Sequence, residues 1–143
     1  MLVTRDNPKL TLEGAKAVLA AAEKRALEIG VPMDIAVLDD GGHLLAFERM
    51  DGAKISSVEI ALGKAYSSAI RKQPSNAAMQ GGQPNVLLSL GLALASRAHQ
   101  TPIRGGLPLM VDGKCVGAIG VSNGTEDQDV DVATAGAAAL ERA

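Results

Sequence analysis

The sequence predicts an α/β domain in which helices cover an antiparallel β-sheet. Two pairs of apolar runs are each joined by a short glycine-containing turn, which is the local signal of a β-hairpin. Segments with helical periodicity flank and separate these pairs. A parallel sheet would place a helix after every strand, so directly joined strands favour an antiparallel arrangement. The predicted order is α-β-β-α-α-β-β-β-α.

Residues 12–29 form the first predicted helix. Thr11 is a typical N-cap residue, Glu13 lies in the positive first turn, and Gly30 ends the pattern. The apolar side chains of this segment fall on one helical stripe, and most of its charged side chains lie elsewhere. We therefore expect an amphipathic helix that buries one face.

The first hairpin is predicted from residues 33–38, a turn at 39–42 with the sequence DDGG, and a second arm at 43–49. Side chains alternate between the two faces of a strand. In the second arm, alternation places four side chains on one face, namely His43, Leu45, Phe47 and Arg49.

A second long helix is predicted over residues 56–72, where Arg71 and Lys72 suit its negative end and Pro74 prevents continuation. Residues 73–84 have the composition of a flexible loop. Residues 85–97 are apolar and predict a shorter helix, although this segment contains a glycine.

The remaining strands are predicted at 99–103 and on either side of the Asp112-Gly113 turn. Thr125 and Gln128 then have the spacing of a capping box, which predicts the start of the last helix. The acidic residues that follow are expected to lie in solvent at the positive end of this helix.

Composition limits the function classes. A chain of 143 residues is long enough for one domain with a real core, so residues 1–143 are read as a single domain. The net charge of −2 and the two aromatic residues argue against nucleic-acid binding. The chain lacks an apolar run of membrane-spanning length and an export-signal pattern, which predicts a cytoplasmic protein. Cys115, the single cysteine, is expected to be a buried, unreactive thiol.

Several blocks of sequence resemble the GlcG/HbpS-like family, which includes the C-terminal domain of PduO-type proteins. The resemblance covers residues 12–140. The matching blocks are DGGHL at 40–44, FERMDGA at 47–53, Glu59-Ile60-Ala61 with Lys64-Ala65, GGLPL at 105–109, GAIGVS at 117–122, and Asp129 with ATAG at 133–136.

This resemblance implies a profilin-like α/β/α fold with a five-stranded antiparallel sheet flanked by helices. It also implies homo-oligomers, and binding of haem or corrinoid-related ligands in some members. Residues 85–97 are more apolar than the resemblance leads one to expect, so a ligand pocket beside them is expected to differ.

His43 is the first candidate site residue, because it follows a Gly-Gly turn and begins a strand. Its imidazole could be an axial haem ligand, and thus the metal ligand, or a general base. The alternative is a strand-start histidine that hydrogen-bonds to its own turn. His99, the other histidine, has no motif around it.

Five further positions are candidate ligand-binding residues. Glu59 and Lys64 share a helix but lie five residues apart, so their side chains do not face each other. Each therefore needs a different partner for its charge. Lys64 could neutralise a ligand carboxylate or haem propionate, or join an ion pair of the protein itself. Arg49 could hold a planar carboxylate or clamp a loop. Gly105 and Gly106 could offer backbone N–H groups to an anion.

Three function hypotheses follow. The first is an oligomeric accessory protein that binds a small molecule, with haem or a related tetrapyrrole as the named candidate. The alternative is a cofactor-free isomerase or lyase of a small carboxylate, with His43, Glu59 or Lys64 moving protons and Arg49 holding the substrate. The third is an assembly module without a ligand. Small residues along the second and last helices favour a homo-oligomer, a dimer at least.

Overall fold

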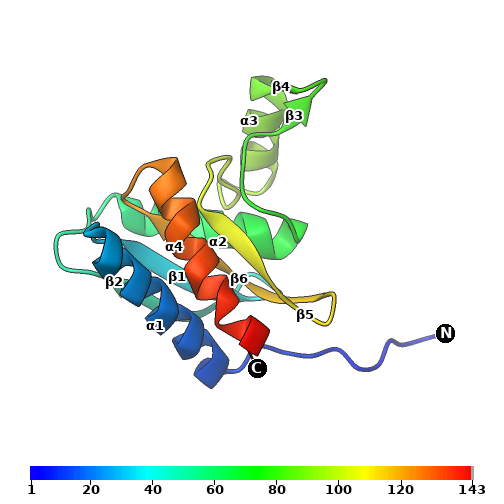
Figure 1. The fold of residues 1–143 in the computed structure, drawn as a ribbon. Helices are drawn as coiled ribbons and strands as arrows, with labels where there is room; N and C mark the ends of the chain where they lie inside the picture. Colours follow the sequence, from blue (N-terminus) through cyan, green and yellow to red (C-terminus); the bar gives the residue numbers. More distant parts are fainter. Residues whose placement is uncertain (143) are drawn as a thin grey trace.

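The computed structural model describes residues 1–142, and its elements build three layers (Figure 1). Helices α1 and α4 cover one face of a four-stranded sheet and α2 covers the other. The helices are α1 (Leu12–Ile29), α2 (Ser57–Arg71), α3 (Val86–Ala95) and α4 (Glu126–Ala138), with a short 3₁₀ turn at Leu140–Arg142. The predicted α/β class is confirmed. Among the described residues, no helix is long and apolar enough to cross a membrane.

The main sheet has the order β2-β1-β6-β5, and every neighbouring pair is antiparallel. Its strands are β1 (Asp34–Asp39), β2 (Leu44–Arg49), β5 (Gly106–Val111) and β6 (Lys114–Ser122). Both predicted hairpins are present, and the long-range pairing of β1 with β6 joins them in one sheet. In that register Ala36 lies between Phe47 of β2 and Gly120 of β6.

The five-stranded sheet was a wrong prediction, because the main sheet of the described residues has four strands. Residues 99–103 form no strand and lie against α2 instead. The Thr101 N–H donates to Ser67 Oγ at 2.7 Å, and the Ile103 carbonyl accepts from Ser75 Oγ at 2.6 Å. Side chains of α2 and of the residues after it thus satisfy backbone groups that a sheet edge would otherwise have paired.

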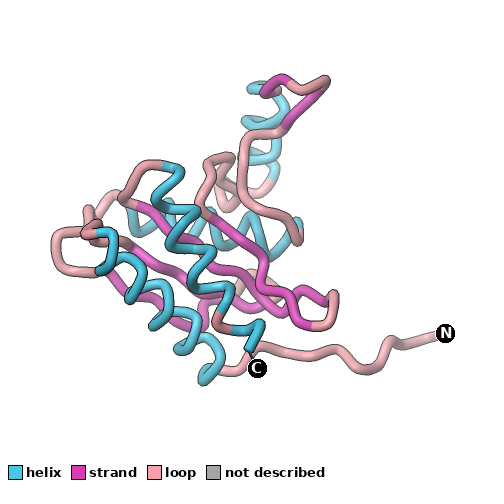
Figure 2. The backbone as a smooth tube through the Cα atoms, viewed as in Figure 1, coloured by secondary structure: helices cyan, strands magenta, loops and turns pink. Residues whose placement is uncertain are grey.

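Residues 76–98 form an arm that projects from the three layers (Figure 2). Part of the segment predicted as a loop forms a two-stranded ribbon of β3 (Met79–Gln80) and β4 (Gln83–Pro84). Helix α3 follows, and the Asn85 side chain caps it by accepting from the Leu88 N–H at 2.9 Å. The predicted apolar helix is therefore present, and among the described residues it stands apart from the main sheet.

Helix α1 has the predicted boundaries, and its ends show why. Thr11 Oγ1 accepts from the Gly14 N–H at 3.0 Å, and Gly30 has a left-handed φ of 72°. The buried face of α1 consists mainly of alanine, which lets α4 approach closely. A side chain at Gly136 of α4 would meet the Ile119 side chain and the Val18 carbonyl oxygen, so glycine is required at that contact.

Helix α2 lies directly on the strand backbones of the other face. A side chain at Gly120 would overlap the Ala61 carbonyl oxygen, and one at Gly106 would overlap that of Lys64. The small residues of α2, Ala61, Ala65 and Ser68 among them, are fully buried against the protein's own sheet. The sequence predicted that these small residues could form a contact between subunits. In the structure they are buried within the chain and are not available for such a contact.

A buried ion pair links α2 with α4 and β6. Lys64 Nζ lies 2.8 Å from Asp129 Oδ2 and donates a second hydrogen bond of 2.8 Å to the Val121 carbonyl. The two side chains are only 1% and 3% exposed. Asp129 Oδ1 accepts from the Gly124 N–H at 2.9 Å. Burial raises the pKa of Asp129, and the Lys64 ammonium opposes that rise by favouring the carboxylate.

We predict that Asp129→Ala lowers the free energy of unfolding by about 3–5 kcal/mol, because it leaves the Lys64 ammonium buried without its counter-charge. The double variant Lys64→Met/Asp129→Leu should lose clearly less than Asp129→Ala alone, since both charges are then absent. Urea denaturation of Lys64→Met, Asp129→Leu and the double variant measures the coupling. Additive losses would contradict a coupled buried pair.

Glu48 of β2 provides a pH-dependent prediction. Burial, and secondly the nearby Glu23 carboxylate of α1, raise the pKa of Glu48 from 4.5 to about 7. Between these values the folded state holds a proton that the unfolded state has released, so stability should fall as pH rises from about 4.5 to about 7. With allowance for solvent screening of this partly exposed group, the fall is on the order of 1–2 kcal/mol.

Glu48→Gln should remove this fall and make the protein more stable than wild type at pH 8, as measured by urea denaturation across pH 4–8. Glu23→Gln should remove only the smaller part, because burial is the larger cause of the shift. An unchanged pH profile in Glu48→Gln would show that another group is responsible.

Candidate functional site

An open cleft of about 670 Å³ is bounded by α2, by the turn between β1 and β2, and by residues 97–99. This volume lies within the usual range of small-molecule sites, roughly 300–1,000 Å³. Apolar side chains contribute much of the lining, including those of Leu38, Leu44 and Leu62.

Helix α2 presents one face to this cleft and the opposite face to the sheet. Glu59, Leu62, Gly63 and Tyr66 follow the i, i+3, i+4, i+7 spacing of a single helical face. Gly63 has a special role, because a side chain there would collide with Thr101. The segment that contains residues 99–101 can therefore lie on α2 only because position 63 has no side chain.

The turn between β1 and β2 holds His43 at the rim of the cleft. Asp39 Oδ1 accepts hydrogen bonds of 2.9 Å from the N–H groups of Gly41 and His43. Gly42 has a φ of 82°, and a side chain there would come within 2.8 Å of the Tyr66 ring. The turn is therefore fixed in shape and packed on Tyr66, and the His43 side chain remains exposed to solvent.

The third wall begins where α3 ends. Arg97 and Ala98 both have left-handed backbone conformations, with φ of 56° and 62°. Such conformations are costly for residues other than glycine, on the order of 1–3 kcal/mol each, and tend to occur at functional sites. The Ala98 N–H donates to the Ala93 carbonyl at 2.7 Å, which closes the helix end. The His99 ring then lies against Tyr66, with centroids 5.3 Å apart and a tilt of 58°.

The cleft therefore combines two imidazoles, one carboxylate and one guanidinium with an apolar lining. Imidazoles can ligate a metal or exchange protons near neutral pH. A guanidinium such as that of Arg97 recognises carboxylates through paired hydrogen bonds. Within residues 1–142, no group of three or more His, Cys, Asp and Glu side chains is arranged to hold a metal ion by itself.

Of the predicted ligand-binding residues, only His43 and Glu59 line this cleft. Arg49 lies at the far end of β2, roughly 20 Å along the strand from His43. Lys64 lies on the opposite face of α2, buried against Asp129.

Gly105 and Gly106 are buried beside Lys64, and their function in this structure is close packing. A side chain at Gly105 would lie 2.8 Å from Lys64 Nζ. The Gly106 N–H is already bound, because it donates to Ser75 Oγ at 2.8 Å.

Tyr66, Arg97 and His99 are lining residues that the sequence did not indicate. Helical spacing from Glu59 could have found Tyr66, because the two residues are seven positions apart on one face. No local signal could have found Arg97 or His99, since their place depends on how the arm returns to α2.

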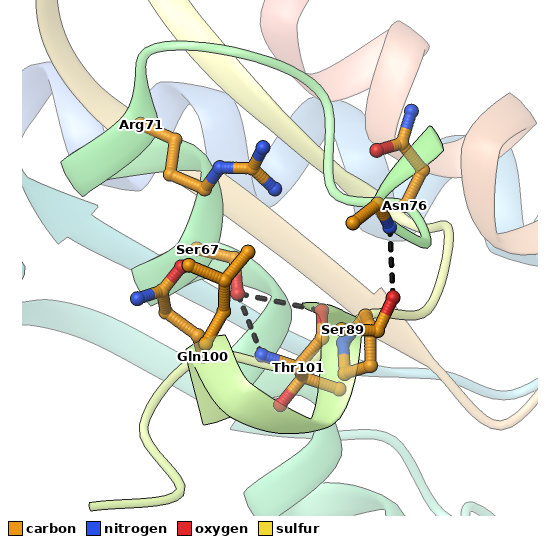
Figure 3. A pocket seen from close by; sticks show the side chains of 9 residues that line it. Ser67, Arg71, Asn76, Ser89, Gln100 and Thr101 are labelled. Atoms are coloured by element: carbon orange, nitrogen blue, oxygen red, sulfur yellow. Dashed lines mark hydrogen bonds between the residues drawn. The ribbon is translucent and has the colours of Figure 1, made fainter. Parts of the chain in front are cut away.

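A second, much smaller cavity lies where the arm joins α2 (Figure 3). Its volume is about 10 Å³, room for one water molecule at most. Ser67 Oγ also donates to the Gly63 carbonyl at 2.8 Å, and the Ala78 N–H donates to Ser89 Oγ at 2.9 Å. The first of these bonds lies within α2 and the second within the arm, while the Thr101 N–H that donates to Ser67 Oγ ties the chain after the arm to α2. The cavity is too small to hold an organic ligand.

Comparison with known proteins places this geometry in context. A family profile described as "Haem degrading protein HbpS-like" matches residues 10–138. The chain is 41% identical over 120 residues to the "Uncharacterized 15.0 kDa protein in dhaT-dhaS intergenic region" of Citrobacter freundii, covering 84% of each. It is 35% identical over 113 residues to Protein GlcG of Escherichia coli K12, covering 79% of this chain and 81% of that protein.

Solved structures share the whole fold. Klebsiella pneumoniae protein ORFY matches with a TM-score of 0.86 and 34% identity, covering 100% and 99% of the two chains. A PduOC:haem complex matches with a TM-score of 0.80 and 26% identity, covering 92% of this chain and 95% of that one. HbpS matches with a TM-score of 0.79 and 31% identity, covering 97% and 94%.

Proposed function

This chain belongs to the family of haem-degrading HbpS-like proteins, and from that premise we propose that it binds haem or a related tetrapyrrole in the cleft beside α2. The observation that carries the proposal is that both histidines of the chain, His43 and His99, line one cleft of about 670 Å³ with apolar walls. The PduOC structure, a similar chain, is a complex with haem.

The residues of the cleft fit the chemistry of haem. Bound haem would supply an iron atom that accepts nitrogen ligands. His43 is the proposed ligand, because its side chain is exposed at the rim and its backbone is fixed by Asp39. Leu62 and Tyr66 offer apolar contact, and Arg97 is placed to pair with a propionate carboxylate.

His99 would either contact the bound tetrapyrrole without ligating its iron or act as a second iron ligand. Its ring already contacts Tyr66, so a ligand that enters the cleft meets an imidazole held by packing. Arg97 takes the carboxylate-binding role for which Arg49 was the sequence-based candidate, because only Arg97 lies at the cleft.

The second candidate function is a cofactor-free isomerase or lyase that acts on a small carboxylate. The cleft favours it in one respect, because His43 and Glu59 are two proton-exchanging groups in the same site as Arg97. Lys64 is 1% exposed and paired with Asp129, so this structure gives it no route to a substrate.

We also propose that the protein is a homo-oligomer. Large apolar side chains remain exposed in the single chain, and most of the arm's large apolar side chains are among them. Contiguous apolar surface of this kind is usually covered by a partner.

Haem titration tests the first proposal. Binding should shift the Soret band of added haem, and His43→Ala and His99→Ala should each weaken the affinity by about tenfold or more. Arg97→Ala should weaken binding, while the matched control Arg49→Ala, at the far end of β2, should not. Circular dichroism confirms that each variant is folded.

An unshifted Soret band, or a shift that persists unchanged in both histidine variants, would refute haem binding in this cleft. Turnover of a small carboxylate by the haem-free protein, lost in His43→Ala and Glu59→Gln, would establish the second candidate instead.

Light scattering tests the oligomer. At micromolar concentration the measured mass should be at least twice the 14.6 kDa of one chain. A mass near 14.6 kDa would show that the chain is a monomer.

A further inference from the structure

The arm of residues 76–98 is electrically neutral along nearly its whole length. Residues 73–96 contain no charged side chain, so the only nearby charges are Lys72 before it and Arg97 at its end. Figure 1 shows α3 standing away from the sheet, and one side of this helix faces the chain at Ala78, whose carbonyl accepts from the Asn85 N–H at 2.7 Å. On that side Ser89 is buried and accepts a hydrogen bond from the Ala78 N–H.

The other side of α3 is an apolar stripe left open to solvent. It consists of Leu87, Leu90, Gly91 and Leu94, which follow the i, i+3, i+4, i+7 spacing of one helical face. The three leucines are 80%, 54% and 69% exposed. A side chain built at Gly91 would have nothing within 4 Å, so no contact within the chain requires glycine there.

We propose that this stripe binds the same stripe of a second copy of the chain, with the two α3 helices antiparallel. The proposal names the interface of the homo-oligomer proposed above and rests on that self-association. Helix α3 spans Val86–Ala95, so its midpoint falls between Leu90 and Gly91. Leu87 and Leu94 are equally far from that midpoint, as a twofold axis there requires.

The pattern suits self-association in three ways. Antiparallel pairing places Leu87 opposite the partner's Leu94, so large apolar side chains meet at both ends of the contact. Gly91 at the centre lets the helix axes approach closely. The neutral arm brings no like charges together when two copies meet.

The exposed area is of the right order for a dimer contact when the ribbon is included. The exposed apolar side chains of the arm supply on the order of 400 Å² per protomer, about half of a standard interface, which buries about 800 Å² per partner. Met79 of the ribbon is also 54% exposed. A membrane surface is a poorer fit, because interfacial helices usually carry lysine and arginine on their polar face and helix α3 has none.

Sedimentation equilibrium without haem tests the interface. Leu87→Glu/Leu94→Glu should raise the dimer dissociation constant by about 100-fold or more, because two buried leucines are lost from each chain. Gly91→Leu should weaken the dimer by about tenfold or more by separating the helices, while its thermal midpoint should not fall, since leucine favours a helix more than glycine does. Leu27→Glu, at a 64% exposed position of α1, is the matched control and should change nothing.

Disulfide trapping tests the antiparallel orientation. In a Cys115→Ser background, a mixture of Leu87→Cys and Leu94→Cys chains should form a cross-linked mixed dimer on oxidation. Either chain alone should cross-link much less, because each position faces the other one across the axis. Preferential cross-linking of Leu87→Cys with itself would overturn the antiparallel arrangement.

The outcomes separate the two proposals. A monomeric wild-type protein would overturn self-association itself, whatever its haem affinity. A wild-type dimer that persists in Leu87→Glu/Leu94→Glu would overturn only the arm interface. Binding of a monomeric wild-type protein to phosphatidylserine vesicles, lost in the same double variant, would assign the stripe to a membrane surface and also overturn the proposal.

Discussion

Helix α2 lies directly on the backbones of β5 and β6, because Gly106 and Gly120 present no side chains beneath it. This contact fixes the rotation of the helix about its own axis. Ala61, Ala65 and Ser68 must then face the sheet, and Lys64 must reach Asp129 on α4. A helix so constrained has only one face left for a ligand, and its residues on that face line the cleft.

The cleft depends on a second glycine contact, at Gly63. Because this position has no side chain, the chain that returns from the arm can lie across α2, where Ser67 binds the Thr101 backbone. That path places His99 against Tyr66 and carries the left-handed residues Arg97 and Ala98 to the rim. The two histidines therefore line one cleft because of how the backbone packs on α2. The residue that permits this packing, Gly63, is distant from both histidines in the sequence.

The arm differs from the rest of the chain in the exposure of its apolar side chains. In the three layers most large apolar side chains are buried, and exposed ones such as Leu27 of α1 are scattered. In α3 the apolar side chains are the exposed ones, and several leucines face solvent. An apolar helix that contributes few side chains to the protein core is consistent with its exposed face being buried by another molecule. Arg97 and His99 follow this helix directly, so the proposed contact between subunits and the proposed ligand site would lie next to each other.

Local chemistry in the sequence determined the elements. The Thr11 cap and Gly30 set the limits of α1, the DDGG turn and the Asp112-Gly113 turn defined the two hairpins, and Thr125 with Gln128 began α4. These features depend on residues within a few positions of each other, so the sequence alone predicts them. His43 and Glu59 could also be chosen as site residues, because each belongs to a recognisable block.

Only the tertiary structure decided the partners of the remaining residues. Lys64 meets an aspartate 65 positions away and becomes part of the core. Arg49 is carried to the far end of its strand, and His99 is brought to the cleft by an arm that the sequence could not orient. Residues 99–103 were predicted to form a strand. In the structure a side chain of α2, and not a strand of the sheet, binds their backbone. Each of these outcomes depends on contacts between segments distant in sequence, and local periodicity contains no information about them.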